Sequence, residues 1–115
     1  MHISFDDKRF RPRVTDGSEG DVNSETVFHY REAGCIVWAT YSGGVVDRGT
    51  LIARKSLDGS LDMRYQHFTI DGTFKSGHCT TIPIAREDGS LELHETWEWL
   101  EGDIGSGTSV LEEIS

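Results

Sequence analysis

Hydrophobic and polar residues alternate along residues 61–67 and 91–99 of the chain. In the first segment the larger side chains fall at every second position: Leu61, Met63, Tyr65 and His67. In the second segment they are Leu91, Leu93, Trp97 and Trp99, and Glu95 interrupts the series. A period of two is typical of an antiparallel strand with one face in water. The second segment also fits the spacing of a helix, but glycine-rich turns on both sides favour a strand.

Six further segments carry a similar mixture of apolar and polar residues, and we expect each to form a strand. They are Lys8–Arg13, Glu25–Glu32, Cys35–Ser42, Val45–Lys55, Gly72–Ile84 and Thr108–Ile114. Pairs that are typical of hairpin turns separate most of the strands: Ala33-Gly34, Gly43-Gly44, Asp58-Gly59, Asp71-Gly72 and Asp88-Gly89. Longer loops are expected at Thr15–Asn23 and around Gly102–Gly107. The pattern thus predicts eight strands and no helix.

The number of strands points to a closed sheet. An open sheet of eight short strands would leave two edges and much apolar surface exposed, and closure into a barrel removes both edges. We therefore predict an all-β fold, a single closed or nearly closed antiparallel up-and-down barrel of about eight strands, over residues 1–115. Residues 87–115 hold nine acidic residues and no Lys or Arg, whereas residues 8–13 are basic. Pairing the first strand with the last would place these basic groups beside Glu112 and Glu113, although two solvated faces would give the same pattern.

Composition narrows the class of protein. A length of 115 residues indicates one domain, and a net charge of −9 argues against a nucleic-acid partner, which needs a basic surface. No apolar run approaches the ~18 residues of a membrane span. The first residues lack the basic and apolar segments of a secretory signal, and only two cysteines are present. We expect a cytoplasmic protein with reduced thiols.

Candidate ligand-binding residues gather at one end of the predicted barrel. The odd-numbered strands of an up-and-down barrel run the same way, so their final residues meet at one mouth. The residues we expect there are Trp38, Tyr41, Arg64, Tyr65, His67, Glu95, Trp97 and Trp99. Arg64 alternates with Tyr65, so a bulge would be needed to turn it inward. An eight-stranded barrel is wide enough either to be filled by side chains or to hold one small ligand.

Glu95 is the most informative of these residues, because an inward carboxylate is costly unless it is paired or hydrogen-bonded. His67, Tyr65, Tyr41 or Arg64 are the expected partners. A carboxylate and an imidazole between aromatic walls suit a small polar ligand, and they also suit general acid–base chemistry. A purely structural bond of Glu95 is the alternative, and Trp97 and Trp99 are then simple core residues.

Other chemistry has little support in the sequence. His78 and Cys79 are adjacent, so on a strand they point to opposite faces, and there is no Cys-x-x-Cys pair. No nucleophile elbow, phosphate loop or dinucleotide fingerprint is present. We assign no catalytic residue, no metal ligand and no cofactor.

Five stretches together resemble a family of small bacterial proteins of unknown function, whose members are sometimes labelled N-acetylglutamate synthase. They are Phe28-His29-Tyr30, residues 38–44 (WATYSGG), Met63-Arg64-Tyr65-Gln66-His67, Gly77-His78-Cys79 and residues 93–99 (LHETWEW). The resemblance covers Phe10 to Glu113 and implies a calycin-like barrel of the lipocalin and avidin type. We do not expect the synthase activity, because the chain has no glycine-rich loop at the start of a helix to grip coenzyme A.

Three functions remain in consideration. The first is binding of a small molecule at the barrel mouth. The second is a small isomerase or hydrolase that uses Glu95 and His67 as acid and base. The third is an interaction module or homodimer whose barrel is packed solid and acts through its outer surface. The volume of the cavity at the mouth distinguishes the third from the other two.

Overall fold

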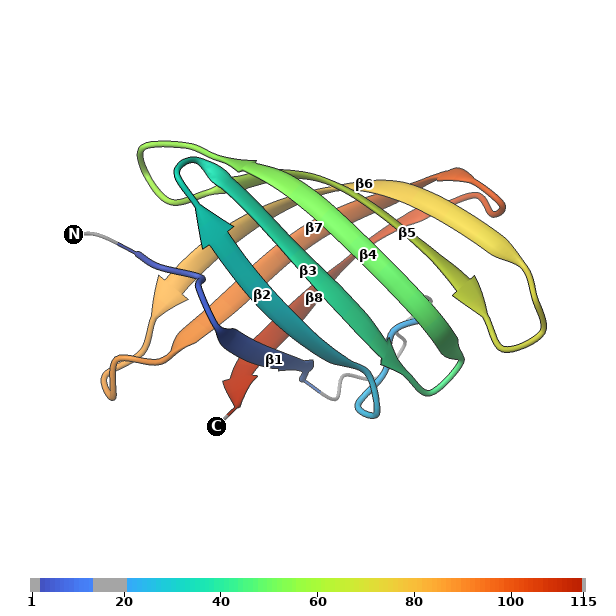
Figure 1. Cartoon of the computed structure of the whole chain (residues 1–115), viewed down its shortest axis with the longest axis horizontal. Helices are drawn as coiled ribbons and strands as arrows, with labels where there is room; N and C mark the ends of the chain where they lie inside the picture. The colour runs from blue at the N-terminus through green and yellow to red at the C-terminus, as the bar shows by residue number, and fades with distance from the viewer. Residues whose placement is uncertain (1–2, 14–20, 115) are drawn as a thin grey trace.

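The computed structural model describes residues 3–13 and 21–114, which form a closed barrel of eight antiparallel strands (Figure 1). The strands are β1 (Lys8–Pro12), β2 (Val27–Ala33), β3 (Ile36–Gly43), β4 (Val46–Lys55), β5 (Leu61–Thr69), β6 (Phe74–Ala85), β7 (Leu91–Glu101) and β8 (Ser106–Ile114). Each strand pairs with its neighbours in sequence, and no helix occurs in the described ranges. The predicted fold class is confirmed. Most of the expected loop at Thr15–Asn23 lies outside the described residues.

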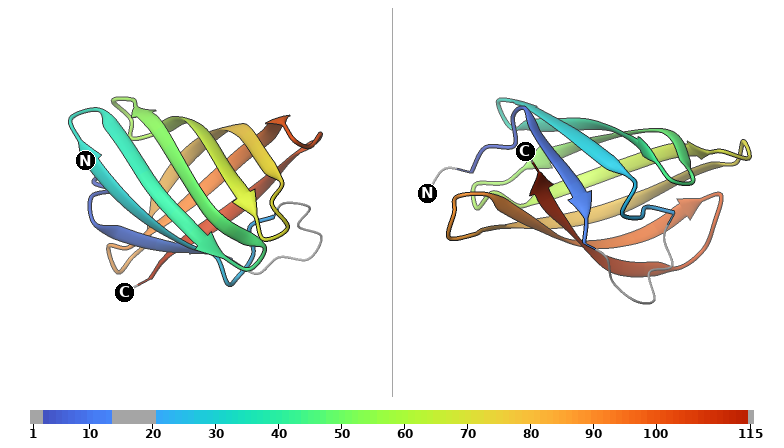
Figure 2. Two further views of the ribbon diagram at one scale, coloured as in Figure 1. Left: turned by 45° about the vertical axis from the view of Figure 1, so that its right-hand side comes forward. Right: turned by 90° about the horizontal axis from the view of Figure 1, so that it is seen from below.

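The barrel closes by pairing β1 with β8, as the charge distribution indicated. Arg11 lies opposite Glu112 in this pair. Arg13 forms ion pairs with Glu112 (Nη2 to Oε1, 3.0 Å) and with Glu92 on β7 (Nη2 to Oε2, 2.6 Å). Figure 2 shows β1 beside the end of β8 when the barrel is viewed from below. The basic segment 8–13 therefore neutralises part of the acidic C-terminal region.

Alternation along the strands decides which side chains fill the barrel. The largest fully buried side chains come from the N-terminal segment and from most of the strands. They are Phe5, Phe10, Tyr30, Val37, Leu61, Leu93 and Leu111, and His67 near the opposite end of the barrel. Phe10 packs edge-on against Tyr30, with ring centroids 5.1 Å apart. Apart from His67, these residues make a dense core in one half of the barrel.

The N-terminal segment closes that packed end. Phe5 is fully buried and its ring lies 6.0 Å from that of Tyr30. Its backbone N–H donates to Glu32 Oε1 at 2.9 Å, and Lys55 Nζ donates to both the Ile3 carbonyl oxygen and Glu32 Oε2. The barrel is consequently a cup, and the ends of β3, β5 and β7 form its open mouth.

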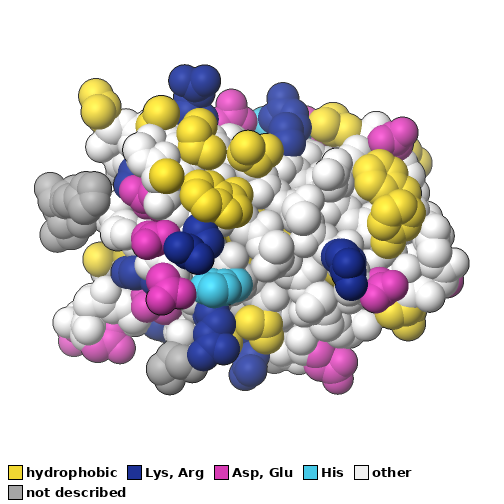
Figure 3. All heavy atoms as spheres, in the orientation of Figure 1, with side chains coloured by type: hydrophobic (Ala, Val, Ile, Leu, Met, Phe, Trp, Pro, Cys, Tyr) yellow, Lys and Arg dark blue, Asp and Glu magenta, His cyan; other side chains and the backbone are white. Residues whose placement is uncertain are grey.

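The outer face carries scattered hydrophobic side chains among charged ones. Figure 3 shows them gathered at the upper left and at the right of this view, with Lys, Arg, Asp and Glu between them. The large hydrophobic residues most exposed on strands include Trp38, Ile52, Phe68, Ile82, Ile84 and Leu100. Trp38 lies opposite Ile52 across the β3–β4 pair. No helix in the described part of the chain is long and apolar enough to cross a membrane.

Candidate ligand-binding cavity

A cavity of about 240 Å³ occupies the open half of the barrel. At ~30 Å³ per molecule this space corresponds to roughly eight waters. Six of the eight predicted residues line it: Tyr41, Tyr65, His67, Glu95, Trp97 and Trp99. Further lining comes from Phe28, Leu51, Met63, Cys79 and Ser109 in the wall and from Arg13, Asp21, Asn23 and Ser24 near the mouth. The barrel is therefore not packed solid.

Trp38 and Arg64 do not line the cavity, and the prediction that they do was wrong. Trp38 is 40% exposed on the outside of β3, because Val37 and Ala39 on either side of it are buried. Arg64 also faces outward, where its Nη1 lies 3.7 Å from Asp62 Oδ1. The strand pairing of β5 is regular on both sides of Arg64, so the bulge that would turn it inward is missing.

Glu95 lies on the cavity wall and is held by two hydroxyl groups. Thr81 Oγ1 donates to Glu95 Oε2 at 3.3 Å, and Ser109 Oγ donates to Oε1 at 3.3 Å. Both donors sit directly opposite Glu95 on the neighbouring strands β6 and β8. The expected partners His67, Tyr65, Tyr41 and Arg64 were therefore the wrong ones. Burial raises the pKa of Glu95 to about 7, and the two hydroxyl bonds only partly oppose this effect.

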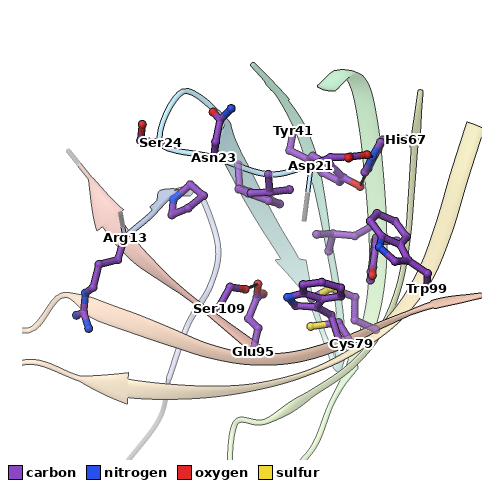
Figure 4. Close-up of a pocket in the computed structure, with 17 residues that line it drawn as sticks. Arg13, Asp21, Asn23, Ser24, Tyr41, His67, Cys79, Glu95, Trp99 and Ser109 are labelled. Carbon is purple, nitrogen blue, oxygen red and sulfur yellow. Dashed lines mark hydrogen bonds and ion pairs between the residues drawn. The ribbon is translucent and has the colours of Figure 1, made fainter. Parts of the chain in front are cut away.

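His67 is almost fully buried, and both of its ring nitrogens are occupied. Nε2 lies 2.8 Å from Asp21 Oδ2, and Nδ1 lies 2.9 Å from the Tyr41 hydroxyl. A carboxylate only accepts, so Nε2 donates to Asp21, and in the neutral ring Nδ1 accepts from Tyr41. Figure 4 shows Asp21, Tyr41 and His67 together on one side of the cavity, apart from Glu95 and Ser109.

This separation removes the geometry expected for an acid–base pair. No hydrogen bond joins Glu95 to His67 in the described residues, and the imidazole has no nitrogen left for a substrate. Burial also raises the pKa of the Tyr41 and Tyr65 hydroxyls and of the Cys79 thiol. These groups stay protonated near neutral pH and are poor nucleophiles. Glu95 and His67 are therefore not placed as the acid and base of one reaction.

Aromatic rings form much of the wall. Phe28 and Tyr41 are stacked with ring centroids 4.7 Å apart, and the centroids of Trp97 and Trp99 are 5.9 Å apart. The Tyr65 ring meets Trp99 edge-on at 5.6 Å. Such rings offer large apolar contact area in fixed positions. Within the described ranges, no group of three or more His, Cys, Asp or Glu is placed to hold a metal ion.

The segment before β2 covers part of the mouth, and its residues were missed by sequence reasoning. Asp21 contacts His67 and also accepts from Lys75 Nζ at 3.1 Å. Thr26 is fully buried, and its Oγ1 donates to the Gly43 carbonyl oxygen at 3.0 Å. Residues 21–26 are thus fastened to β3, β5 and β6.

We expect Asp21→Asn to loosen this segment. The substitution removes the charge that holds both His67 and Lys75, and charge-assisted hydrogen bonds are stronger than neutral ones. Amide hydrogen exchange across residues 21–26 should rise about 5- to 30-fold, which corresponds to ~1–2 kcal/mol of local stability. Asp103→Asn is the matched control, because Asp103 is the other carboxylate on Lys75 (3.0 Å) and is largely exposed. Equal exchange in the two variants would contradict the role of Asp21.

An eight-stranded antiparallel barrel with an internal cavity at one end is the architecture of the calycin-like proteins. The chain matches the model of one such family, described as avidin-like protein, over residues 3–114. It therefore belongs to the avidin-like family. Neither the curated proteins nor the solved structures gave a significant match.

Proposed function

We propose that this protein binds one small organic molecule inside the open half of its barrel. The observation that carries the proposal is the 240 Å³ cavity, lined by four aromatic residues of the predicted mouth and by the carboxylate of Glu95. A concave, mostly apolar site with a few converging polar groups is the usual form of a small-molecule site. Membership of the avidin-like family, which binds small ligands of the biotin kind, supports the same function.

Both shape and rigidity favour binding. The packed core and Phe5 close the opposite end, so a ligand enters and leaves through the mouth. The wall residues are fixed by strand pairing and by ring contacts, so few side chains lose freedom when a ligand enters. The volume limits the buried part of the ligand to about the size of a single substituted ring.

We expect Trp97→Ala to weaken binding by about tenfold or more, because an aromatic wall contributes on the order of 1–2 kcal/mol to a buried ligand. Ligand-observed NMR and calorimetry with benzylamine, benzyl alcohol, benzoate and biotin as probes would measure this. Trp38→Ala is the matched control, since Trp38 has the same side chain on the outer face. The Trp97→Phe variant, if folded, should keep part of the affinity that Trp97→Ala loses. The proposal is wrong if none of the four probes binds at millimolar concentration, or if Trp38→Ala weakens binding as much as Trp97→Ala.

A further inference from the structure

Glu95 faces the cavity without a basic partner. Its two oxygens receive hydrogen bonds from the Thr81 and Ser109 hydroxyls, both at 3.3 Å. These donors are neutral and near the long end of hydrogen-bond distance. In the part of the chain that the structure describes, no Lys, Arg or His forms an ion pair with this carboxylate. A carboxylate inside a barrel without a cationic partner has lost its hydration, and no opposite charge compensates for that loss. A positive charge beside it would therefore be favourable.

The other charged groups around the cavity already have opposite charges beside them. Asp21 is held by His67 and Lys75, and Arg13 is held by Glu92 and Glu112. Figure 4 shows the Arg13 guanidinium pointing away from the centre of the cavity. Glu95 is therefore the charge that a ligand inside the cavity meets.

The aromatic wall suits a cation as well. The faces of Trp and Tyr rings attract ammonium groups, most strongly where water is excluded. Trp99 already does this at the rim, where Lys75 Nζ lies 5.3 Å from the centroid of its ring. Trp97 lies two residues from Glu95 on the same inward face of β7, so one ammonium group can reach both the carboxylate and the ring.

We infer that the ligand is a small organic cation, a protonated amine on an apolar body, whose ammonium group binds Glu95 while the body packs against Trp97 and its aromatic neighbours. This inference rests on the proposed function and specifies the chemical class of its ligand. The amine supplies the positive charge and the N–H donors that the Thr81 and Ser109 hydroxyls do not. The net charge of −9 also concentrates cations near the molecule.

The inference predicts a particular pH dependence. Burial raises the pKa of Glu95 to about 7, so the empty site is about nine-tenths ionised at pH 8 and about one-tenth ionised at pH 6. Affinity for an amine should therefore fall about tenfold from pH 8 to pH 6. The other titratable groups that face Glu95 are Tyr30, Tyr41, Tyr65 and Cys79, from β2, β3, β5 and β6, and burial raises the pKa of each, so they stay neutral in this range. His67 and Asp21 also face the cavity, and the Glu95→Gln variant keeps both.

Calorimetry with three probes of one shape tests the inference. Benzylamine, benzyl alcohol and benzoate differ mainly in charge, and each is titrated into the wild-type protein, Glu95→Gln and Glu98→Gln at pH 8 and pH 6. Glu98 is an exposed acid on the same strand, so its variant makes the same change in net charge outside the barrel. Circular dichroism confirms that each variant is folded.

We expect benzylamine to bind the wild-type protein at pH 8 at least tenfold more tightly than benzyl alcohol, and benzoate to bind most weakly. This preference and its pH dependence should disappear in Glu95→Gln and persist in Glu98→Gln. Binding of benzyl alcohol or benzoate as tight as that of benzylamine, or a preference for the amine that survives in Glu95→Gln, would overturn the cationic ligand and leave the proposed binding function standing. Absence of binding by every probe would contradict the proposed function itself.

Discussion

Gly43→Ala should destabilise the protein by about 3–5 kcal/mol, whereas Gly105→Ala should cost only about 1–2 kcal/mol. Both glycines have nearly the same positive φ, +122° at Gly43 and +118° at Gly105, so alanine is strained at both. A Cβ atom at Gly43 would also overlap the carbonyl oxygen of Glu25, but at Gly105 it would meet no atom of the described structure within 4 Å. The backbone of residue 25 cannot move aside easily, because the neighbouring Thr26 is buried and bonded to the Gly43 carbonyl.

The measurement is urea unfolding of the two variants and the wild-type protein, followed by circular dichroism. The difference between the variants isolates the close approach of residues 25 and 43 from the common strain of a left-handed residue. Gly43→Ala should also raise hydrogen exchange in residues 21–26, because the added Cβ would push against residues 25 and 26, and Thr26 holds the segment to the Gly43 carbonyl oxygen. Equal losses of stability in the two variants would show that the approach of the two backbones is unimportant.

Glu95→Gln should make the protein more stable than the wild type by about 3 kcal/mol at pH 8, and this advantage should vanish near pH 4.5. Burial raises the pKa of Glu95 from 4.5 in the unfolded chain to about 7 in the folded one. Between these values the folded state binds more protons than the unfolded state, so stability falls as pH rises. Above pH 7 the folded protein carries a buried negative charge on Glu95. A glutamine side chain has no charge, and its amide can still form hydrogen bonds with the Thr81 and Ser109 hydroxyls.

The free energy of unfolding of both proteins is measured by urea at several pH values from 4.5 to 8. Their difference cancels the titration of every group that they share. Glu101→Gln serves as the control and should show no such pH dependence, because Glu101 is exposed on the same strand and forms no ion pair with any described residue. A constant difference between Glu95→Gln and wild type across this range would mean that Glu95 is not protonated preferentially in the folded state. A residue such as Glu95 that lowers the free energy of unfolding but serves binding is common in ligand sites.

The strands were predictable because each depends on a local pattern, and closure was predictable from the number of strands. Alternation identified β5 and β7, and the Asp-Gly pairs at residues 58, 71 and 88 separate strands as expected. Opposite charges at the two ends of the chain supported the pairing of β1 with β8, although two solvated faces fitted the same pattern equally well. Alternation also predicts that Trp38 faces outward. Trp38 and Tyr41 are three residues apart on one strand, so their side chains point to opposite faces, and Tyr41 faces inward. Grouping Trp38 with the other aromatic residues overrode that signal.

The partners of Glu95 and the cover of the mouth could not be predicted in the same way. Thr81 and Ser109 meet Glu95 because of the register between three strands, and a shift of one residue would turn these side chains outward. Asp21 reaches His67 from an irregular segment whose path no periodic pattern describes. Contacts that depend on register or on the course of a loop require the three-dimensional structure.

The pairing of β1 with β8 has a consequence for how the protein folds. Arg9 lies opposite Ile114, so the sheet closes into a barrel only when the two ends of the chain meet. Contacts between residues so distant in sequence are costly in chain entropy, and proteins dominated by them fold in milliseconds to seconds. The hairpins from β2 to β8 form from nearby residues, but Pro12 on β1 reaches Leu111 on β8 only when the barrel closes, and both Pro12 and Ser109 line the cavity. The ligand cavity is therefore among the last parts of the molecule to be assembled.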